Sequence, residues 1–113
     1  LIGQGLSLAF RDARSLSEIL LAGNDWSAGS LRPYAEERRA RVERVRCTAA
    51  LMAAIYATFT PDGAARRARF LARLPEPDFR GRSLLACLGL GPERSPDWAY
   101  SAAFRSEVLA PGK

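Results

Sequence analysis

The chain has 113 residues, of which 48% are hydrophobic and 26% charged, and its Lys and Arg residues outnumber Asp and Glu by 17 to 12. This apolar content excludes a disordered tail, and two cysteines are too few for a disulfide-rich secreted scaffold. Histidine, the commonest general base and metal ligand, is absent from the sequence, so we expect no catalytic residue and no metal site in this chain.

The composition predicts an all-α fold, because Ala, Leu and Arg are abundant and β-branched residues are scarce. The first predicted helix covers residues 6–22 and ends at Gly23. Its apolar side chains recur every three or four residues and form one stripe, which comprises Leu6, Ala9, Ala13, Leu16 and Leu20.

A second, long helix is predicted after a loop in which Trp26 serves as a packing anchor. Ser30 is its candidate N-cap, and the apolar pattern continues to Phe59, which gives about 30 residues, or about 45 Å. Glu37 and Arg41 are spaced to form an ion pair along this helix. Met52 and Phe59 are expected in the core.

Three shorter helices are predicted in the rest of the chain. Thr60 caps a helix that ends near Leu74, a second helix covers residues 79–88, and Ser95 with Pro96 starts a third that reaches Val108. Cys47 and Cys87 are interpreted as free, buried thiols, with a single disulfide as the alternative. Trp98 is expected to pack in the core.

The most specific segment is the turn that enters the first helix. Gly3, Gln4 and Gly5 lead directly into Leu6 and Ser7. Such a turn presents bare backbone N–H groups at the positive end of a helix dipole, and its glycines allow a planar ligand to approach the main chain. On physical grounds alone, a plain turn remains the alternative.

Residues 3–16, with the sequence GQGLSLAFRDARSL, resemble the third conserved segment of flavin-dependent aromatic hydroxylases, the para-hydroxybenzoate hydroxylase type of FAD monooxygenase. That family has G-x-G-[LMF]-[NS] at the start of a helix, followed by Asp-Ala and a Leu, and Ser7 stands where it often has Asn. A second stretch is similar to the family's W…L…YE.eRr pattern and comprises Trp26, Leu31, Tyr34, Glu37, Arg38 and Arg39. The resemblance covers about residues 1–60.

The resemblance implies that Gly3, Gln4, Gly5, Leu6 and Ser7 contact the flavin ring of FAD. In the family, NAD(P)H reduces FAD and oxygen is then used to hydroxylate a small organic, often aromatic, substrate. The Rossmann G-x-G-x-x-G fingerprint is absent from this sequence. We therefore expect the C-terminal part of a larger α/β FAD-binding chain, inactive by itself, with residues 1–22 belonging to the FAD-binding domain and 23–113 forming a helical C-terminal region.

Two alternatives from other functional classes remain open. The arginines of residues 38–46 and of residues 66–73 are typical of a small nucleic-acid-binding module, but interleaved glutamates and the lack of aromatics within 38–46 favour a solvated or interdomain face. A helical protein-interaction module is the other alternative. The sequence has no apolar run long enough for a membrane span. We expect no signal peptide, a cytoplasmic location and no membrane partners.

Overall fold

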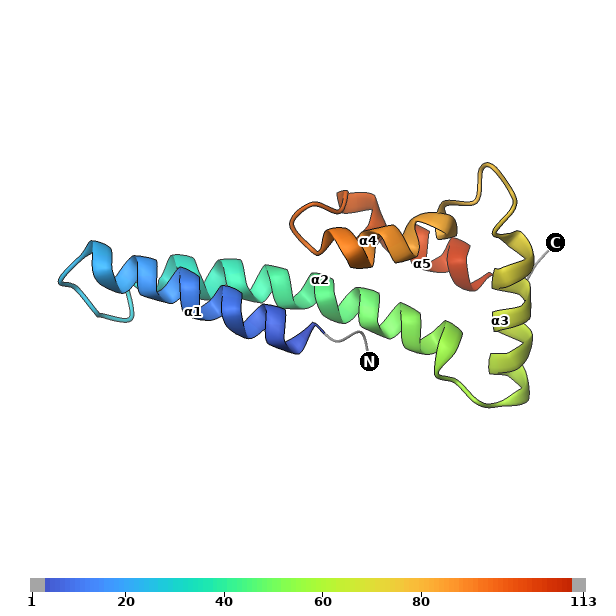
Figure 1. Ribbon diagram of the computed structural model, residues 1–113, viewed down its shortest axis with the longest axis horizontal. Helices are drawn as coiled ribbons and strands as arrows, with labels where there is room; N and C mark the ends of the chain where they lie inside the picture. Colours follow the sequence, from blue (N-terminus) through green and yellow to red (C-terminus); the bar gives the residue numbers. More distant parts are fainter. Residues whose placement is uncertain (1–3, 111–113) are drawn as a thin grey trace. The chain divides into compact units, whose positions relative to one another are not determined.

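The computed structural model of the protein describes residues 4–110, and these residues form helices joined by loops, with no strand among them (Figure 1). Five α-helices follow one another: α1 (Gly5–Ala22), α2 (Arg32–Tyr56), α3 (Pro61–Arg73), α4 (Leu84–Leu90) and α5 (Ala102–Leu109). Two short 3₁₀ turns, Arg80–Ser83 and Asp97–Tyr100, precede α4 and α5. The all-α prediction is confirmed for these residues, whereas the larger α/β fold stays a prediction.

The described chain forms two compact units, residues 4–43 and residues 44–110, and the division between them falls in the sequence of α2. The family resemblance places a different boundary after residue 22, between the FAD-binding domain and the helical C-terminal region of the family. That boundary stays a prediction.

The unit of residues 44–110 is organised around a hydrophobic core. Its buried cluster comprises Leu51, Ile55, Phe70, Phe79, Leu84, Phe104 and Val108. The Phe70 ring meets those of Tyr56 and Phe79 edge to face, with centroids 6.1 and 5.7 Å apart. Cys47 and Cys87 are both free; Cys87 is buried and Cys47 half-buried. Trp98 packs against the same core, as expected.

The helix caps of this unit follow local sequence signals. The Thr60 hydroxyl accepts a hydrogen bond from the Gly63 N–H at 3.1 Å, and Pro61 occupies the first turn of α3, as predicted. The last helix begins later than expected, because Ser101, and not Ser95, caps α5 by accepting from the Phe104 N–H at 3.1 Å. Ser95 is instead buried and donates to the carbonyls of Cys87 and Gly91.

Helix α2 has 25 residues, so the prediction of about 30 was too long at both ends. The Ser30 hydroxyl does not cap the helix; it donates to the carbonyls of Asp25 and Ser27 and holds the preceding turn. At the other end, the Thr58 hydroxyl donates to the Ala53 carbonyl, and the chain leaves the helix before α3. Phe59 is consequently 86% exposed and not part of the core.

In the unit of residues 4–43, α1 runs antiparallel to the first half of α2, and residues 23–31 connect them (Figure 1). The predicted apolar stripe turns inward only in its second half: Leu16 and Leu20 are half-buried, whereas Leu6, Ala9 and Ala13 are exposed. The half-buried face of the helix overlaps the stripe there and comprises Leu8, Asp12, Ser15, Leu16, Ile19 and Leu20. Trp26 is 70% exposed and is held by a hydrogen bond from its indole N–H to the Leu20 carbonyl, so it is not a packing anchor.

Candidate functional site

The start of α1 is open to its surroundings. Gln4 is the N-cap residue and its side chain makes no capping hydrogen bond. The first backbone bond of the helix runs from the Leu8 N–H to the Gln4 carbonyl at 2.9 Å, so the N–H groups of Gly5, Leu6 and Ser7 have no acceptor within the helix. All three of these residues are exposed, and a Cβ built on Gly5 would meet no atom within 4 Å.

The predicted site residues therefore lie together at one helix end, with one exception. Gly3 lies outside the described residues, whereas Gln4, Gly5, Leu6 and Ser7 form the cap and first turn of α1. Three N–H groups without an acceptor in the helix and the partial positive charge of the helix end can stabilise an anionic or electron-rich group placed against this turn.

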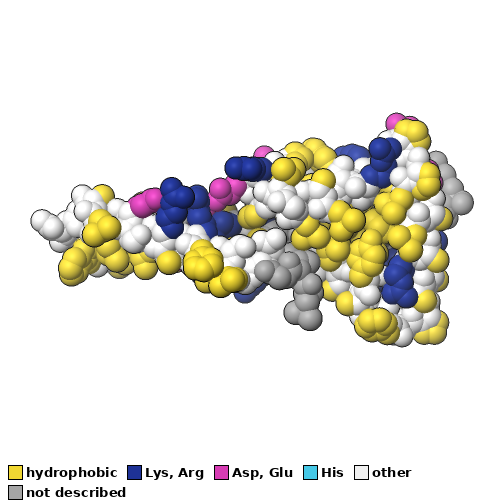
Figure 2. Space-filling model, viewed as in Figure 1, with side chains coloured by type: hydrophobic (Ala, Val, Ile, Leu, Met, Phe, Trp, Pro, Cys, Tyr) yellow, Lys and Arg dark blue, Asp and Glu magenta, His cyan; other side chains and the backbone are white. Residues whose placement is uncertain are grey.

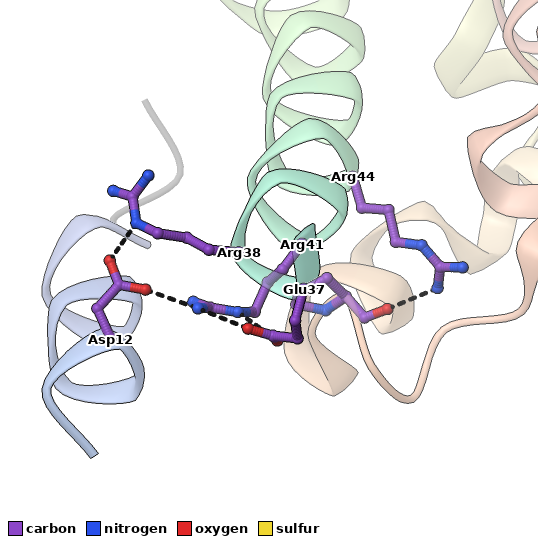
Figure 3. Close-up of polar contacts among 6 residues, drawn as sticks. Asp12, Glu37, Arg38, Arg41 and Arg44 are labelled. Carbon is purple, nitrogen blue, oxygen red and sulfur yellow. Dashed lines mark hydrogen bonds and ion pairs between the residues drawn. The ribbon is translucent and has the colours of Figure 1, made fainter. Parts of the chain in front are cut away.

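Two turns further along α1, Asp12 forms ion pairs with two arginines of α2 (Figure 3). One carboxylate oxygen accepts from Arg38 Nε at 2.8 Å, and the other accepts from Arg41 Nη2 at 2.6 Å. The hydrogen bond from Arg41, together with the bond and charge of Arg38, lowers the pKa of Asp12 below its usual value despite partial desolvation. Asp12 is therefore a carboxylate at neutral pH.

Arg41 is the centre of this network, and only 4% of its side chain is exposed. Its Nε donates to one oxygen of Glu37 at 2.9 Å, which confirms the predicted pair along α2, and its Nη2 reaches the other oxygen at 3.2 Å. Its Nη1 is buried without a hydrogen-bond partner among the described residues. Two carboxylates thus hold one buried guanidinium between the helices.

The contacts of Asp12 with Arg38 and Arg41 were not predicted from the sequence. Spacing around the loop carries the signal that could have revealed them. Asp12 lies 15 residues before Ser27, the middle of the connection, and Arg41 lies 14 residues after it. Positions equally distant from a short turn face one another in an antiparallel helix pair.

Apolar side chains lie exposed on the outer side of α1. Leu6 and Phe10, one turn apart, are 67% and 68% exposed, and Leu21 is exposed further along the helix. Figure 2 shows a row of hydrophobic side chains along one edge of the α1–α2 hairpin, separate from a group of charged side chains. An apolar row of this kind is typical of a surface that another protein element covers.

Several arginines of the two basic clusters serve as internal contacts. Within residues 44–110, Arg44 donates to the carboxylate of Asp97 at 2.6 Å and to the Pro92 carbonyl at 3.0 Å. Arg66 donates to the Ala54 carbonyl near the end of α2. Together with Arg38 and Arg41, these residues use their guanidinium groups within the fold, which argues against a surface that tracks phosphates.

No cluster of three or more His, Cys, Asp and Glu side chains suited to a metal ion occurs within residues 4–110. Across the same residues, no helix combines the length and apolar character that a membrane crossing requires. Comparison with protein-family models, curated proteins and solved structures found no match to this chain.

Proposed function

We propose that this chain forms the C-terminal helical part of an FAD-dependent monooxygenase of the aromatic hydroxylase type. The observation that carries the proposal is the pairing of the two segments in which the resemblance lies. Asp12, from the first segment, binds Arg38, from the second, and the two segments thereby form one antiparallel hairpin. Among residues 4–110, no side chain covers the helix start that the family places against flavin.

The residues present fit a flavin at the start of α1. Gly5 leaves room for a planar ring system to approach the main chain, because, apart from its chain neighbours and its own helix backbone, no described atom lies within 4 Å of the position that a Cβ would take. The N–H groups of Gly5, Leu6 and Ser7 would donate to the electron-rich edge of the ring, and the helix dipole would stabilise negative charge there. When bound, FAD would accept hydride from NAD(P)H and supply the chemistry of oxygen activation.

The outer face of α1 supports the same proposal. Leu6 and Phe10 lie one turn apart at the start of the helix, next to the proposed flavin contact, and both are mostly exposed. The remainder of an FAD-binding chain would cover them and complete the pocket. The organic substrate would bind in that remainder, because residues 4–110 contain no strand and we expect no catalytic residue in this chain.

The test uses the complete reading frame that encodes this chain. The purified protein is expected to show the visible absorption of bound oxidised flavin and to oxidise NADPH or NADH. In a Gly5→Leu variant the side chain would enter the space of the ring, so we expect FAD affinity to fall at least about tenfold, which corresponds to about 1.4 kcal/mol. A purified wild-type protein that neither contains nor binds FAD would overturn the proposal.

Gly89→Leu is the matched control for this experiment. Gly89 also lies in a helix, α4, and a Cβ there would likewise meet no atom within 4 Å. The two variants therefore add the same side chain to open space, but only Gly5 lies at the proposed flavin contact. Equal loss of FAD affinity in both variants would show that the effect is not specific to the start of α1.

A further inference from the structure

The contact between α1 and α2 within residues 4–43 contains no buried apolar side chain. Arg41 is the one buried residue of this described segment, and the apolar residues of α1 are half-buried or exposed. Apolar packing is non-directional and tolerates sliding, whereas ion pairs with defined donor geometry do not. The polar network of Asp12, Glu37, Arg38 and Arg41 is therefore the most directional contact between these two helices.

The geometry of this network fixes α1 along its own axis. Each oxygen of Asp12 binds a different arginine, at 2.8 Å to Arg38 and 2.6 Å to Arg41, and these arginines lie three residues apart on α2 (Figure 3). Sliding α1 by one residue would move Asp12 by about 1.5 Å, which is enough to break a hydrogen bond. Arg41 is itself held in place by Glu37.

We infer that Asp12, Arg38, Arg41 and Glu37 are positioning residues that set how far the start of α1 projects toward its flavin. Asp12 lies seven residues, or about 10 Å along the helix axis, from Gly5, and acts there only through the rigid helix. A displacement of about 1 Å at a reacting centre can cost about 100-fold in rate. This inference rests on the function proposed above.

The experiment compares Asp12→Asn with Glu18→Gln in the complete flavoprotein. Glu18 is the matched control, because its pair with Arg14, at 2.9 Å, is also an arginine–carboxylate contact but lies within α1 alone. With Asp12→Asn we expect the dissociation constant of FAD to rise about tenfold. At saturating FAD, we expect a lower flavin reduction potential and an altered visible spectrum, since the displaced helix end stabilises the reduced ring less. Glu18→Gln is expected to match the wild type in all three measurements.

A purely structural role would lower the thermal stability of Asp12→Asn but leave the potential and spectrum at saturating FAD unchanged, and that result overturns the inference. If Asp12→Asn does not fold, Arg38→Gln replaces it, because Arg38 is half exposed and its loss buries no unpaired charge. A wild-type protein that binds no FAD overturns the proposed function itself. A wild type that binds FAD with variants indistinguishable from Glu18→Gln overturns only the positioning role.

Discussion

At the scale of single residues, Gly81 shows how closely the core of residues 44–110 is packed. Gly81 is buried, and a Cβ built on it would lie 2.3 Å from the Phe79 Cζ atom. The Phe79 ring is itself fixed by the edge of Phe70 and by Arg73, whose guanidinium carbon lies 4.0 Å from the ring centroid. The ring therefore has little freedom to make room.

We expect Gly81→Ala to lower the free energy of unfolding by about 1–3 kcal/mol, the usual cost of overpacking a core. Urea denaturation, monitored by circular dichroism, measures this change in the free energy of unfolding. Gly89→Ala is the control, because its added methyl group meets no atom within 4 Å, and we expect it to be neutral or to stabilise by up to about 1 kcal/mol. Equal stabilities of the two variants would contradict the packing described at Gly81.

The lowered pKa of Asp12 predicts that the contribution of this carboxylate to folding stability depends on pH. Hydrogen bonds from Arg41 and Arg38 favour the charged form of Asp12 in the folded chain. Its contribution to stability is therefore complete above the unfolded pKa of about 3.9 and is lost as the pH falls through the lower pKa of the folded state.

We expect Asp12→Asn to destabilise the hairpin of residues 4–43 by about 2 kcal/mol near neutral pH, and by progressively less as the pH falls below about 3.9. Fluorescence of Trp26 during urea denaturation, in a Trp98→Phe background, reports on the hairpin. The measurement is made near neutral pH and again below about pH 3.9. If the variant and the wild type differed in unfolding free energy by the same amount at the two pH values, the assigned direction of the Asp12 pKa would be contradicted.

At the scale of elements, α3 depends on its first turn. Thr60 satisfies one of the four N–H groups that the start of any helix leaves unpaired, through its bond with Gly63. The far end of the same helix is tied to α5, because Arg73 donates to the Glu107 carbonyl at 2.9 Å. The cap at its start and the Arg73 hydrogen bond at its end therefore fix both ends of α3.

We expect Thr60→Ala to lower the free energy of unfolding by about 1 kcal/mol, since the Gly63 N–H loses its acceptor. Thr60→Ser keeps the hydroxyl and serves as the control, with a stability close to that of the wild type. Thermal denaturation measures both variants. If Thr60→Ser were as destabilised as Thr60→Ala, the lost methyl group and not the cap would be responsible.

At the scale of the whole molecule, the two units differ in the contacts that stabilise each of them internally. Residues 44–110 have a buried cluster of aromatic and aliphatic side chains, whereas α1 has no buried residue. Most helical stability in proteins comes from packing an apolar face. The two units should therefore differ in local stability.

We expect the amides of α1 to exchange with solvent much faster than those around Leu51 and Ile55, because helices without buried apolar contacts open at low free-energy cost. Hydrogen–deuterium exchange resolved by peptide measures this difference in the isolated chain. Equal protection of α1 and of the C-terminal half of α2 would show that α1 is stabilised by more than its polar network.

Local signals in the sequence determined most of the elements. The helix-forming composition predicts an all-α fold, and apolar spacing with cap and proline signals divides it into five helices. Thr60 with Pro61 predicts the start of α3, because caps and prolines act within one turn of chain. The Glu37–Arg41 pair follows from helical spacing in the same way. The helix start at Gly5–Ser7 was also visible as a candidate site, and its role with flavin stays a prediction.

The tertiary structure decided which faces and ends these elements use. The inward face of α1 carries Asp12 together with Leu16 and Leu20, and leaves Leu6 of the predicted stripe exposed; Arg38 and Arg41 on the neighbouring helix attract the Asp12 carboxylate. Likewise, α2 ends at Tyr56 and leaves Phe59 exposed, since the turn into α3 is stabilised by groups that no periodicity describes. The spacing of apolar residues shows which side chains share a face of a helix. Which face is buried depends on the neighbouring helix, and this neighbour is known only from the folded structure.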